Sequence, residues 1–275
     1  MSARSERTVL VTGANSGIGL ATTLHLAKLG FRVVGSVRSE AKARHVADVA
    51  ARTGVSVETL VMDVTDADRC VTVIETLQPW ALVNNAGYSG VGAIEDITDD
   101  EARRQLETMV IAPMRLARLS LPHMRAAGGG RIVNISSIYG FTTTPFSGWY
   151  QAAKHALEAL SDALRNEVAR EGIKVVLIEP GGIKTGIWEE LEEDVARHGG
   201  SSYGAAYERT LVVLKLLQGL MGEPSGVAKV VGKALVASCP RARYLVGPDA
   251  LAIAAAQTLV PTEVRDRVTR LVAGL

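Results

Sequence analysis

A tyrosine, a lysine and two serines that could move a proton lie close together between residues 136 and 154. Tyr150 and Lys154 are four residues apart, and in a helix this spacing puts both side chains on one face. The alanines and leucines after Tyr150 have the apolar spacing of a helix. An ammonium group beside a phenol favours phenolate and lowers the tyrosine pKa from about 10 toward neutral pH. The pair therefore predicts proton exchange with an alcohol or a carbonyl compound; the alternative is an ordinary exposed pair on a helix.

A glycine-rich turn near the start of the chain predicts a nucleotide site. Residues 9–11 are apolar, Gly13, Gly17 and Gly19 follow, and helical apolar spacing begins at Leu20. Glycines let the backbone approach a pyrophosphate, and the helix N-terminus offers free N–H groups and a partial positive charge. The spacing differs from G-x-G-x-x-G, so a plain tight turn is the alternative. Its position between a strand and a helix favours a dinucleotide.

Strands and helices are predicted to alternate along most of the chain. Apolar runs predict strands at residues 8–12, 31–37, 55–62, 80–83, 131–135, 174–178 and 243–247. Helical patterns cover residues 20–29, 41–51, a stretch from about 67, 98–127, 150–170, 227–236 and 250–275. This alternation predicts an α/β Rossmann fold with a doubly wound parallel sheet, whose ligands bind at the C-terminal ends of the strands. Gly13, Asn85, Ser137 and Pro180 all fall at such ends.

The ends of the second and third predicted strands bear on the choice of dinucleotide. An acidic residue about 20 positions after the glycines suits the ribose 2′-hydroxyl of NAD, whereas an arginine suits the 2′-phosphate of NADP. The second strand ends at Arg38, and the first acid is Glu40. Arg38 therefore favours NADP(H), with NAD(H) as the second choice and a solvated arginine as the alternative. Asp63 either accepts a hydrogen bond from the adenine amino group or caps the helix that begins near Ala67.

The composition argues against several classes of function. With 47% hydrophobic residues and a net charge of +1, the chain has no electrostatic basis for binding nucleic acid. Cys70 and Cys239 lack the spacing of a metal site and are expected to be free thiols in a reducing compartment. Residues 1–7 lack the apolar run of a signal peptide, and the apolar run 250–256 is far shorter than the ~20 residues that cross a bilayer. We expect one cytoplasmic domain, residues 1–275, without an integral membrane segment.

Residues 186–222 break the alternation of strands and helices. Trp188, Tyr203, Tyr207 and the apolar run 211–217 are interleaved there with acids and glycines. This pattern predicts a helical lid over a substrate, and a surface helical hairpin is the alternative.

Five motifs together resemble those of the short-chain dehydrogenase/reductase family of NAD(P)-dependent oxidoreductases, in its single-domain form. In the family's order, they are Thr12-Gly13-x-x-x-Gly17-x-Gly19, Asn84-Asn85-Ala86-Gly87, Ser137, Tyr150-x-x-x-Lys154 and Pro180-Gly181. The similarity covers almost the whole chain. The apolar lid and the segment 244–275 look most similar to the steroid and retinoid branch of the family.

The resemblance implies a role for each matching residue. Ser137, rather than Ser136, would steady the substrate oxygen; Tyr150 would be the general acid/base; Lys154 would lower its pKa and hold the nicotinamide ribose. The implied cofactor-binding residues are Gly13, Ser16, Gly17, Ile18 and Gly19 at the pyrophosphate, Arg38 at the 2′-phosphate, Asp63 and Val64 at the adenine, Asn85, Ala86 and Gly87 along the adenosine and nicotinamide side, Tyr150 and Lys154, and Pro180, Gly181, Ile183 and Thr185, the last two near the carboxamide. No metal is required.

One position departs from the family pattern. Met109 stands where the family usually has a catalytic asparagine, whose backbone carbonyl holds a water of the proton relay. Pro113, four residues later, has no N–H to donate to the Met109 carbonyl. We expect either that Pro113 opens the helix and frees this carbonyl for the relay water, or that an ordinary proline kink accompanies a slower or differently connected relay.

The predicted function is interconversion of an alcohol and a ketone or aldehyde on a small lipophilic substrate, with NADP(H) preferred. The alternative from another class is a catalytically weak NADPH-binding regulator, which only Met109 favours. A third alternative keeps the cofactor but uses it for epimerisation or dehydration, and the absence of a larger C-terminal substrate domain argues against it. The family resemblance also implies a homodimer or homotetramer formed through the helices predicted at 98–127 and 150–170.

Overall fold

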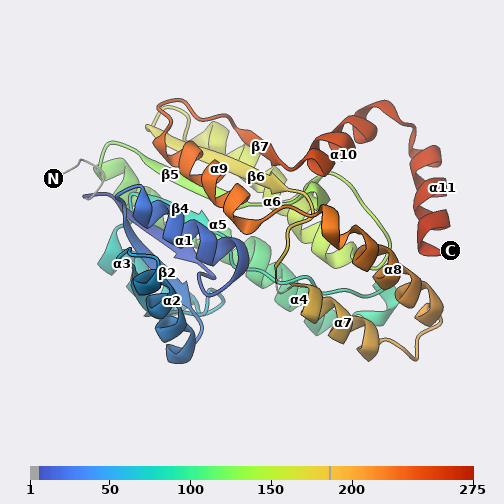
Figure 1. Ribbon diagram of the computed structural model, residues 1–275. Helices are drawn as coiled ribbons and strands as arrows, with labels where there is room; N and C mark the ends of the chain where they lie inside the picture. The colour runs from blue at the N-terminus through green and yellow to red at the C-terminus, as the bar shows by residue number, and fades with distance from the viewer. Residues whose placement is uncertain (1–5, 186) are drawn as a thin grey trace.

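A seven-stranded parallel sheet forms the centre of the computed structural model, which describes residues 6–185 and 187–275. Residues 1–5, part of the segment 1–7 without an apolar run, and Gly186, at the start of the predicted lid, lie outside the described residues. The strand order is β3-β2-β1-β4-β5-β6-β7 (Figure 1). The strands are β1 (Thr8–Thr12), β2 (Arg32–Val37), β3 (Glu58–Val61), β4 (Ala81–Asn84), β5 (Gly130–Ile135), β6 (Ile173–Pro180) and β7 (Arg243–Val246). All seven predicted strands are present, although β3 begins at residue 58 rather than 55.

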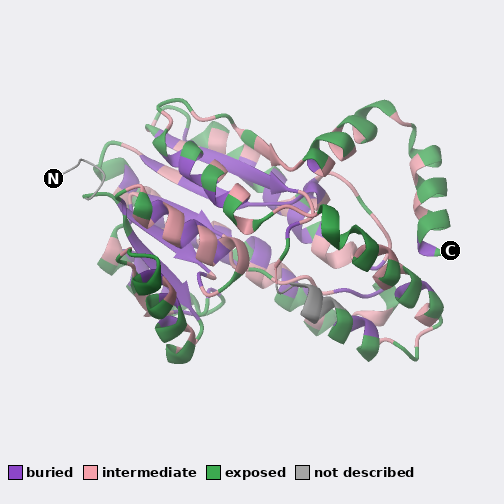
Figure 2. Ribbon diagram, viewed as in Figure 1, coloured by how far each residue is buried: buried purple, intermediate pink, exposed green. Residues whose placement is uncertain are grey.

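Helices cover both faces of the sheet, which confirms the predicted doubly wound fold. Successive side chains of a strand point to opposite faces. Val9 and Val11 of β1 therefore join the core under α1 (Gly17–Lys28) and α9 (Pro224–Val236), while Leu10 joins the core under α3 (Ala67–Leu77) and α5 (Ala112–Ala126). Figure 2 shows the sheet as the most continuously buried part of the molecule. Strand order reverses between β1 and β4, where folds of this type bind their ligands.

The helix predicted at residues 98–127 is divided into three parts. It begins as α4 (Asp99–Leu106), where Thr98 and Glu101 form a capping box. It then widens into a π-helical turn, η2 (Glu107–Ile111), before α5 continues. The N–H of Ala112 reaches back to the carbonyl of Glu107, and Pro113 has no N–H that could restore the α-helical pattern. The helix is therefore distorted where Met109 lies, as predicted; a relay water on the Met109 carbonyl stays a prediction.

The helix that carries Tyr150, α6 (Gly148–Glu167), ends before the predicted residue 170. Beyond Glu167 the chain continues in tight turns, with the N–H of Ala169 donating to Asn166 and that of Glu171 to Val168. Such three-residue turns commonly finish a helix. The remaining helix of the first half is α2 (Glu40–Arg52), close to its predicted bounds.

The segment predicted as a lid folds into α7 (Ile187–Arg197), α8 (Gly204–Leu217) and a 3-10 turn, η4 (Gln218–Leu220). The end of the chain forms α10 (Pro248–Leu259) and α11 (Thr262–Ala273). Helix α11 lies against α8 (Figure 1), where the Arg209 guanidinium donates to the carbonyls of Leu271 and Val272. Within the described residues no helix combines the length and apolarity needed to cross a membrane.

Candidate active site

The C-terminal ends of four strands bring most of the predicted site residues to one edge of the sheet. β1 pairs with β4, β4 with β5 and β5 with β6, all in parallel. The residues that follow these strands, or end them, are therefore neighbours: Gly13, Asn85, Ser137 and Pro180. The predicted gathering of these positions is confirmed.

The turn after β1 has a geometry that only glycine allows at two positions. Gly13 has a φ of 65°, a left-handed conformation that side chains disfavour. A Cβ atom on Gly19 would lie 2.1 Å from the carbonyl oxygen of Gly13, far inside contact distance. The turn then leads through Ser16 into the N-terminus of α1, whose first turn contains no acidic residue. A backbone free of side chains and a helix N-terminus together fit a pyrophosphate.

Asn85 and Thr12 hold this turn in place. The Asn85 amide donates to the carbonyls of Thr12 at 2.9 Å and Gly13 at 3.2 Å. The Thr12 hydroxyl accepts from the N–H groups of Asn85 and Ala86, both at 3.0 Å. Asn85 therefore fixes the glycine turn, in addition to lying beside Ala86 and Gly87 where a cofactor is predicted.

Arg38 is exposed just beyond the end of β2, next to the glycine turn. The turn touches this strand end directly, because the N–H of Ala14 donates to the carbonyl of Ser36 at 3.0 Å. A guanidinium that follows this strand end is in the position expected of a ligand for a ribose phosphate on the same edge.

The structure corrects one alternative for Asp63. Helix α3 is capped by Asp66, whose carboxylate accepts from the N–H of Arg69 at 2.9 Å. Asp63 instead accepts from the N–H and the hydroxyl of Thr65, at 2.9 and 2.8 Å. The capping role for Asp63 is wrong, because the helix begins one residue after Asp66. A contact of Asp63 and the buried Val64 with adenine stays a prediction.

Ser137, Tyr150 and Lys154 meet above the end of β5. Ser137 starts a 3-10 turn, η3 (Ile138–Gly140), and its hydroxyl lies beside the Tyr150 phenol, whose pKa it lowers. The Lys154 ammonium lies 5.6 Å from the centre of the Tyr150 ring. The Tyr139 ring stands edge-on to Tyr150 at 6.0 Å.

The pKa of Tyr150 differs from the expectation. Protein atoms around the phenol raise its pKa to about 12, and this desolvation outweighs the effect of Ser137. The predicted lowering by Lys154 is absent in the described structure, because the ammonium points to the carbonyl oxygen of Ile135, at 2.8 Å. Burial also lowers the pKa of Lys154, to about 8, against the opposing charge of Glu158.

The two serines face different partners, which agrees with the choice of Ser137 over Ser136. The Ser136 hydroxyl is buried beside the Glu158 carboxyl. Both groups lie next to Gly140: a Cβ atom added there would be 2.8 Å from the Ser136 Oγ and 3.1 Å from the Glu158 Oε1. Ser137 alone accompanies the Tyr150 phenol.

The loop after β6 closes the site on the other side of the glycine turn. Thr185 lies against Gly17, where an added Cβ atom would come within 3.0 Å of the threonine methyl. The Gly181 N–H donates to Val246, and the buried Ile183 pairs with Gly222. Of the predicted residues on this loop, Thr185 thus contacts the glycine turn and Ile183 shares a core with Ile18, while Pro180 and Gly181 lie at the end of β6 beside β7.

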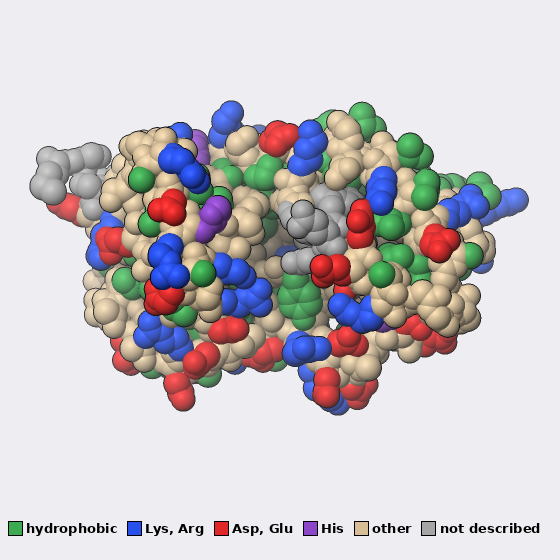
Figure 3. All heavy atoms as spheres, turned by 60° about the horizontal axis from the view of Figure 1, so that its bottom comes forward, with side chains coloured by type: hydrophobic (Ala, Val, Ile, Leu, Met, Phe, Trp, Pro, Cys, Tyr) green, Lys and Arg blue, Asp and Glu red, His purple; other side chains and the backbone are tan. Residues whose placement is uncertain are grey.

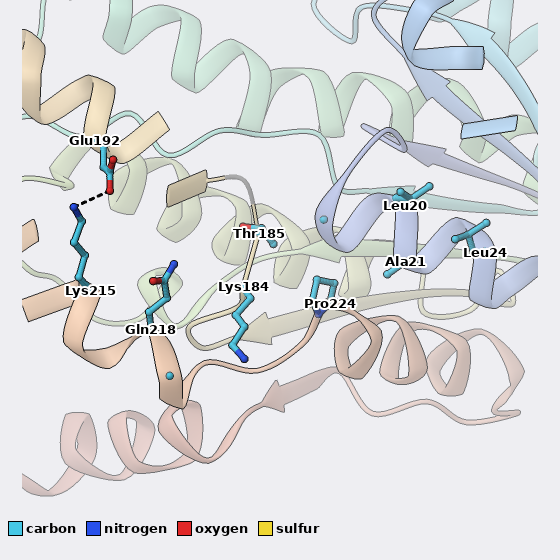
Figure 4. A pocket seen from close by; sticks show the side chains of 11 residues that line it. Leu20, Ala21, Leu24, Lys184, Thr185, Glu192, Lys215, Gln218 and Pro224 are labelled. Atoms are coloured by element: carbon cyan, nitrogen blue, oxygen red, sulfur yellow. Dashed lines mark ion pairs between the residues drawn. The ribbon is translucent and has the colours of Figure 1, made fainter. Parts of the chain in front are cut away.

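A groove of about 990 Å³ lies beyond Thr185 (Figure 4). Leu20, Ala21 and Leu24 of α1 form its apolar wall, and Lys184 lines it from the loop after β6. An ion pair of 2.9 Å between Glu192 and Lys215 joins α7 and α8 across it. Basic and acidic side chains are interspersed over the face shown in Figure 3, with no area of a single sign.

Sequence reasoning missed the residues that hold the loop before Tyr150. The Gln151 amide is buried and exchanges hydrogen bonds with the backbone of Thr144, at 3.2 and 3.1 Å. Phe146 has a φ of 65° and packs against Tyr207 at 4.6 Å. Nothing in the sequence indicates that Phe146, a non-glycine residue, adopts a positive φ. Gln151 is visible next to Tyr150 in the sequence, but its partner Thr144 could not be predicted.

The α7–α8 segment is attached to the loop after β4 by further residues absent from the prediction. The Tyr207 hydroxyl accepts from the N–H of Ala93 and donates to the Asp96 carboxylate at 2.6 Å. The Asp194 carboxylate accepts from the N–H of Val91 at 2.9 Å. These contacts link residues more than 100 positions apart, so no local pattern could predict them.

Comparison with known proteins agrees with this geometry. The family model described as short chain dehydrogenase matches residues 7–196. The NADPH-dependent 3-dehydrocapnine reductase of Ornithobacterium rhinotracheale is 34% identical, over 95% of each chain. Retinol dehydrogenase 16 of Mus musculus is 31% identical, over 89% of this chain and 82% of its own.

Solved structures of the same kind superpose over most of the chain. A short-chain dehydrogenase from Streptomyces avermitilis has a TM-score of 0.79 and 32% identity, over 98% of this chain and 97% of its own. An actinorhodin polyketide ketoreductase with NADPH has a TM-score of 0.77 and 28% identity, over 90% and 97%. From the matched motifs, the strand-end site and these relatives, we conclude that the chain belongs to the short-chain dehydrogenase family of NAD(P)-dependent oxidoreductases.

Proposed function

We propose that the protein interconverts a secondary alcohol and a ketone or aldehyde on a hydrophobic substrate, with NADP(H) as the preferred cofactor. The observation that carries the proposal is the meeting of Ser137, Tyr150 and Lys154 at the end of β5, on the same edge of the sheet as the glycine turn after β1. A hydride-transfer reaction needs a proton donor on the same edge of the sheet as the turn that binds the dinucleotide.

The cofactor fits the backbone around the glycine turn. Gly13, Gly17 and Gly19 would hold its pyrophosphate at the N-terminus of α1, and Arg38 would pair with the 2′-phosphate. Asp63 and Val64 would flank the adenine, and Ile183 and Thr185 the carboxamide. When bound, the nicotinamide supplies or accepts the hydride.

The protein's own groups handle the proton. In the direction of reduction, Tyr150 donates its hydroxyl proton to the substrate oxygen as the carbon is reduced, and Ser137 donates a hydrogen bond that orients that oxygen. Lys154, whose ammonium is held by the Ile135 carbonyl, would bind the nicotinamide ribose. In the direction of oxidation, the phenolate accepts the proton from the alcohol.

Two observations support NADPH over NADH. Arg38 stands at the strand end where an acidic residue would bind the NAD ribose, and it is exposed with no ion-pair partner among the described residues. The relative from Ornithobacterium rhinotracheale is named for its dependence on NADPH, and the actinorhodin ketoreductase structure contains NADPH.

Exposed leucines at the end of the α7–α8 segment support a lipophilic substrate. Leu216 and Leu220 are 78% and 79% exposed, and each directly follows in sequence a residue that lines the groove, Lys215 or Gly219. Exposed leucines of this kind are unfavourable in water and suit an apolar ligand. The α7–α8 segment would act as the lid over that ligand, and a relative named for retinol agrees with an apolar alcohol.

A catalytically weak NADPH-binding regulator is the second candidate. Met109 in place of the usual asparagine favours it, as does a Tyr150 pKa of about 12, which opposes phenolate formation. Both candidates bind NADPH, so only turnover separates them.

The proposed function is tested by NADPH and NADH oxidation across a panel of lipophilic and polar ketones, with cofactor binding measured separately by fluorescence. Turnover with NADPH on the lipophilic ketones is the expected result. Binding of NADPH without turnover on any carbonyl compound or alcohol would favour the regulator, and a preference for NADH would remove the role of Arg38.

We also propose a homodimer or homotetramer formed through the α4–α5 and α6 helices. Ile111 and Leu160, on these helices, are 50% and 42% exposed, which suits apolar contact with a second copy. Sedimentation of the protein and of an Ile111→Glu, Leu160→Glu double variant tests this: a monomeric wild-type protein would contradict it.

A further inference from the structure

The loop after β6, residues 181–185, begins with two glycines, so its own side chains do little to fix its course. Gly181 and Gly182 lose more conformational freedom on ordering than any other residue type would. The contacts that hold these glycines therefore determine where Ile183 and Thr185 lie. The proposed function places those two residues at the nicotinamide carboxamide, so a group that fixes the loop acts on the reacting half of the cofactor.

Two neighbouring backbone segments hold the loop. The Gly181 N–H donates to the carbonyl of Val246, at the end of β7, at 3.0 Å. The Gly182 carbonyl accepts from the Gly222 N–H, and the Lys184 N–H donates to the Gly222 carbonyl, both at 2.9 Å. The Gly182 N–H lies between these attachments and is bound by neither segment.

The Gly182 N–H donates instead to a side chain 67 positions away in sequence, the carboxylate of Asp249, at 2.6 Å. Asp249 lies in the first turn of α10. A Cβ atom on Gly181 would lie 2.1 Å from its Oδ2, and one on Gly247 would lie 2.3 Å from its Oδ1. The carboxylate thus fills the space that side chains at both positions would occupy, and it reaches Gly182 because both are glycine.

The Asp249 carboxylate has no other role among the described contacts. It forms no ion pair with the described side chains, and its hydrogen bond is the one from Gly182 rather than one to its own helix. An acid in a first helical turn stabilises that helix through its charge, without any particular partner. A hydrogen bond from a backbone N–H to an ionised acceptor is stronger than one to a neutral acceptor, so this contact holds the loop firmly.

Resting on the proposed function, we propose that Asp249 is a positioning residue for the nicotinamide half of the cofactor. Its carboxylate fixes Gly182, and further along the loop the Thr185 methyl lies against Gly17 of the glycine turn. The loop is then ordered before the cofactor arrives, so the entropy of ordering it does not weaken binding. The adenosine half, which would bind beyond β2 and β3, does not depend on this loop.

The competing explanation is that Asp249 only attaches the C-terminal helices to the sheet. Loss of such an attachment would lower the stability of the fold and weaken both halves of the cofactor alike, or neither. Loss of a positioning group would weaken only a ligand that contains nicotinamide. NADP⁺ and 2′,5′-ADP provide the comparison, because 2′,5′-ADP has the adenosine and its 2′-phosphate but no nicotinamide.

The test is calorimetric titration of the wild-type protein and its variants with NADP⁺ and with 2′,5′-ADP. Asp249→Ala should weaken NADP⁺ binding by about 10-fold or more, the effect of losing a hydrogen bond to a charged group, and leave 2′,5′-ADP affinity within about twofold. Asp249→Asn keeps the shape and one acceptor oxygen but not the charge, so it should restore part of the lost NADP⁺ affinity.

Glu263→Ala is the matched control for these variants. Glu263 is also an acid in the first turn of a C-terminal helix, α11, and it is exposed. Both affinities should be unchanged in this variant. Equal losses of both ligands in Asp249→Ala, no loss of either, or the same selective loss in Glu263→Ala would overturn the proposal.

Thermal unfolding shows whether each variant folds. If Asp249→Ala does not fold, Asp249→Asn decides alone. A selective loss of NADP⁺ affinity in Asp249→Asn then supports the proposal, and unchanged or equally reduced affinities for the two ligands refute it.

The titrations need no turnover, so this proposal and the proposed function can fail separately. A selective loss of NADP⁺ affinity in Asp249→Ala, without turnover of any carbonyl compound or alcohol by the wild-type protein, would retain the role of Asp249 and refute the proposed reaction. Turnover with NADPH, together with equal NADP⁺ affinity in the wild-type protein and Asp249→Ala, would do the reverse. A wild-type protein that binds neither ligand would refute both.

Discussion

The Lys154 ammonium donates a 2.8 Å hydrogen bond to the carbonyl of Ile135, the last residue of β5. The lysine is thereby fixed to the sheet rather than to Tyr150, and its charge is buried against a neutral oxygen. This arrangement costs stability whenever the lysine is charged, and it makes the site sensitive to pH.

Relative to Lys154→Met, the free energy of unfolding of the wild-type protein should increase as the pH rises from about 8 to 10.5. The Lys154 pKa is about 8 in the folded protein and has its ordinary value of 10.5 in the unfolded chain. The unfolded chain therefore binds more protons than the folded protein across this pH range. The gain is at most about 3 kcal/mol. Chemical denaturation of both proteins at several pH values measures it, and subtraction removes the contributions of other groups. A difference that stays constant with pH would contradict the prediction.

Tyr150→Phe should lower turnover by about 10²- to 10⁴-fold, because the proton donor is lost while the ring remains. NADPH binding, measured by fluorescence, should change little. Tyr139→Phe is the matched control, since its ring stands edge-on to Tyr150 but has no proposed proton role. Equal losses in the two variants would remove the assignment of Tyr150.

Arg38→Ala should reduce kcat/KM for NADPH by about 10- to 100-fold, the effect of losing hydrogen bonds to a charged group. Activity with NADH should be nearly unchanged, because NADH has no 2′-phosphate. Arg44→Ala, an exposed arginine on α2, is the control. A parallel loss with both cofactors would show that Arg38 acts on something other than the phosphate.

Gly19→Ala should abolish NADPH binding and destabilise the protein by about 1–3 kcal/mol. The new methyl group would meet the Gly13 carbonyl and the Asn85 amide, at 2.1 and 2.5 Å, which are both parts of the turn. Gly226→Ala in α9 meets nothing within 4 Å and should be neutral or slightly stabilising. Cofactor titration and thermal unfolding of both variants provide the comparison; normal NADPH affinity in Gly19→Ala would place the cofactor elsewhere.

Tyr207→Phe should raise KM for the carbonyl substrate more than it lowers kcat. The variant leaves the Ala93 N–H and the Asp96 carboxylate without the hydroxyl that joins them, at a cost of about 1–3 kcal/mol. Tyr203→Phe, whose hydroxyl has no such partners among the described contacts, serves as the control. Steady-state kinetics and limited proteolysis near residues 198–203 measure both effects. Unchanged kinetics would mean that α8 does not cover the substrate.

The order of strands and the glycine turn could be predicted because they depend on local patterns. A buried parallel strand is a short apolar run, and the residues that follow it necessarily meet at one edge of the sheet. Gly13, Ser137 and Pro180 can therefore be placed together from the sequence alone. Helix ends were less predictable. No glycine or proline follows Glu167 directly to indicate that α6 ends there, and the π-helical turn at Glu107–Ile111 depends on Pro113, which has no N–H and lies two residues after the turn.

The electrostatics of the site could not be predicted from spacing. Tyr150 and Lys154 are four residues apart, yet the direction of the Tyr150 pKa depends on how tightly other elements enclose the phenol. Glu158 follows Lys154 by one helical turn. The Arg243 guanidinium that contacts both Glu158 and Glu179 comes from β7, and only the folded sheet brings it to α6.

The contacts of Tyr207 and Asp194 with the loop after β4 have a thermodynamic consequence for ligand binding. Ordering a backbone residue costs about 1–2 kcal/mol of conformational entropy. Because α7 and α8 are already attached to Val91, Ala93 and Asp96, most of this entropy is lost when the chain folds rather than when a ligand arrives. Ligands should then be selected mainly by their fit to a preformed surface, and binding should show only a small ordering entropy in calorimetry.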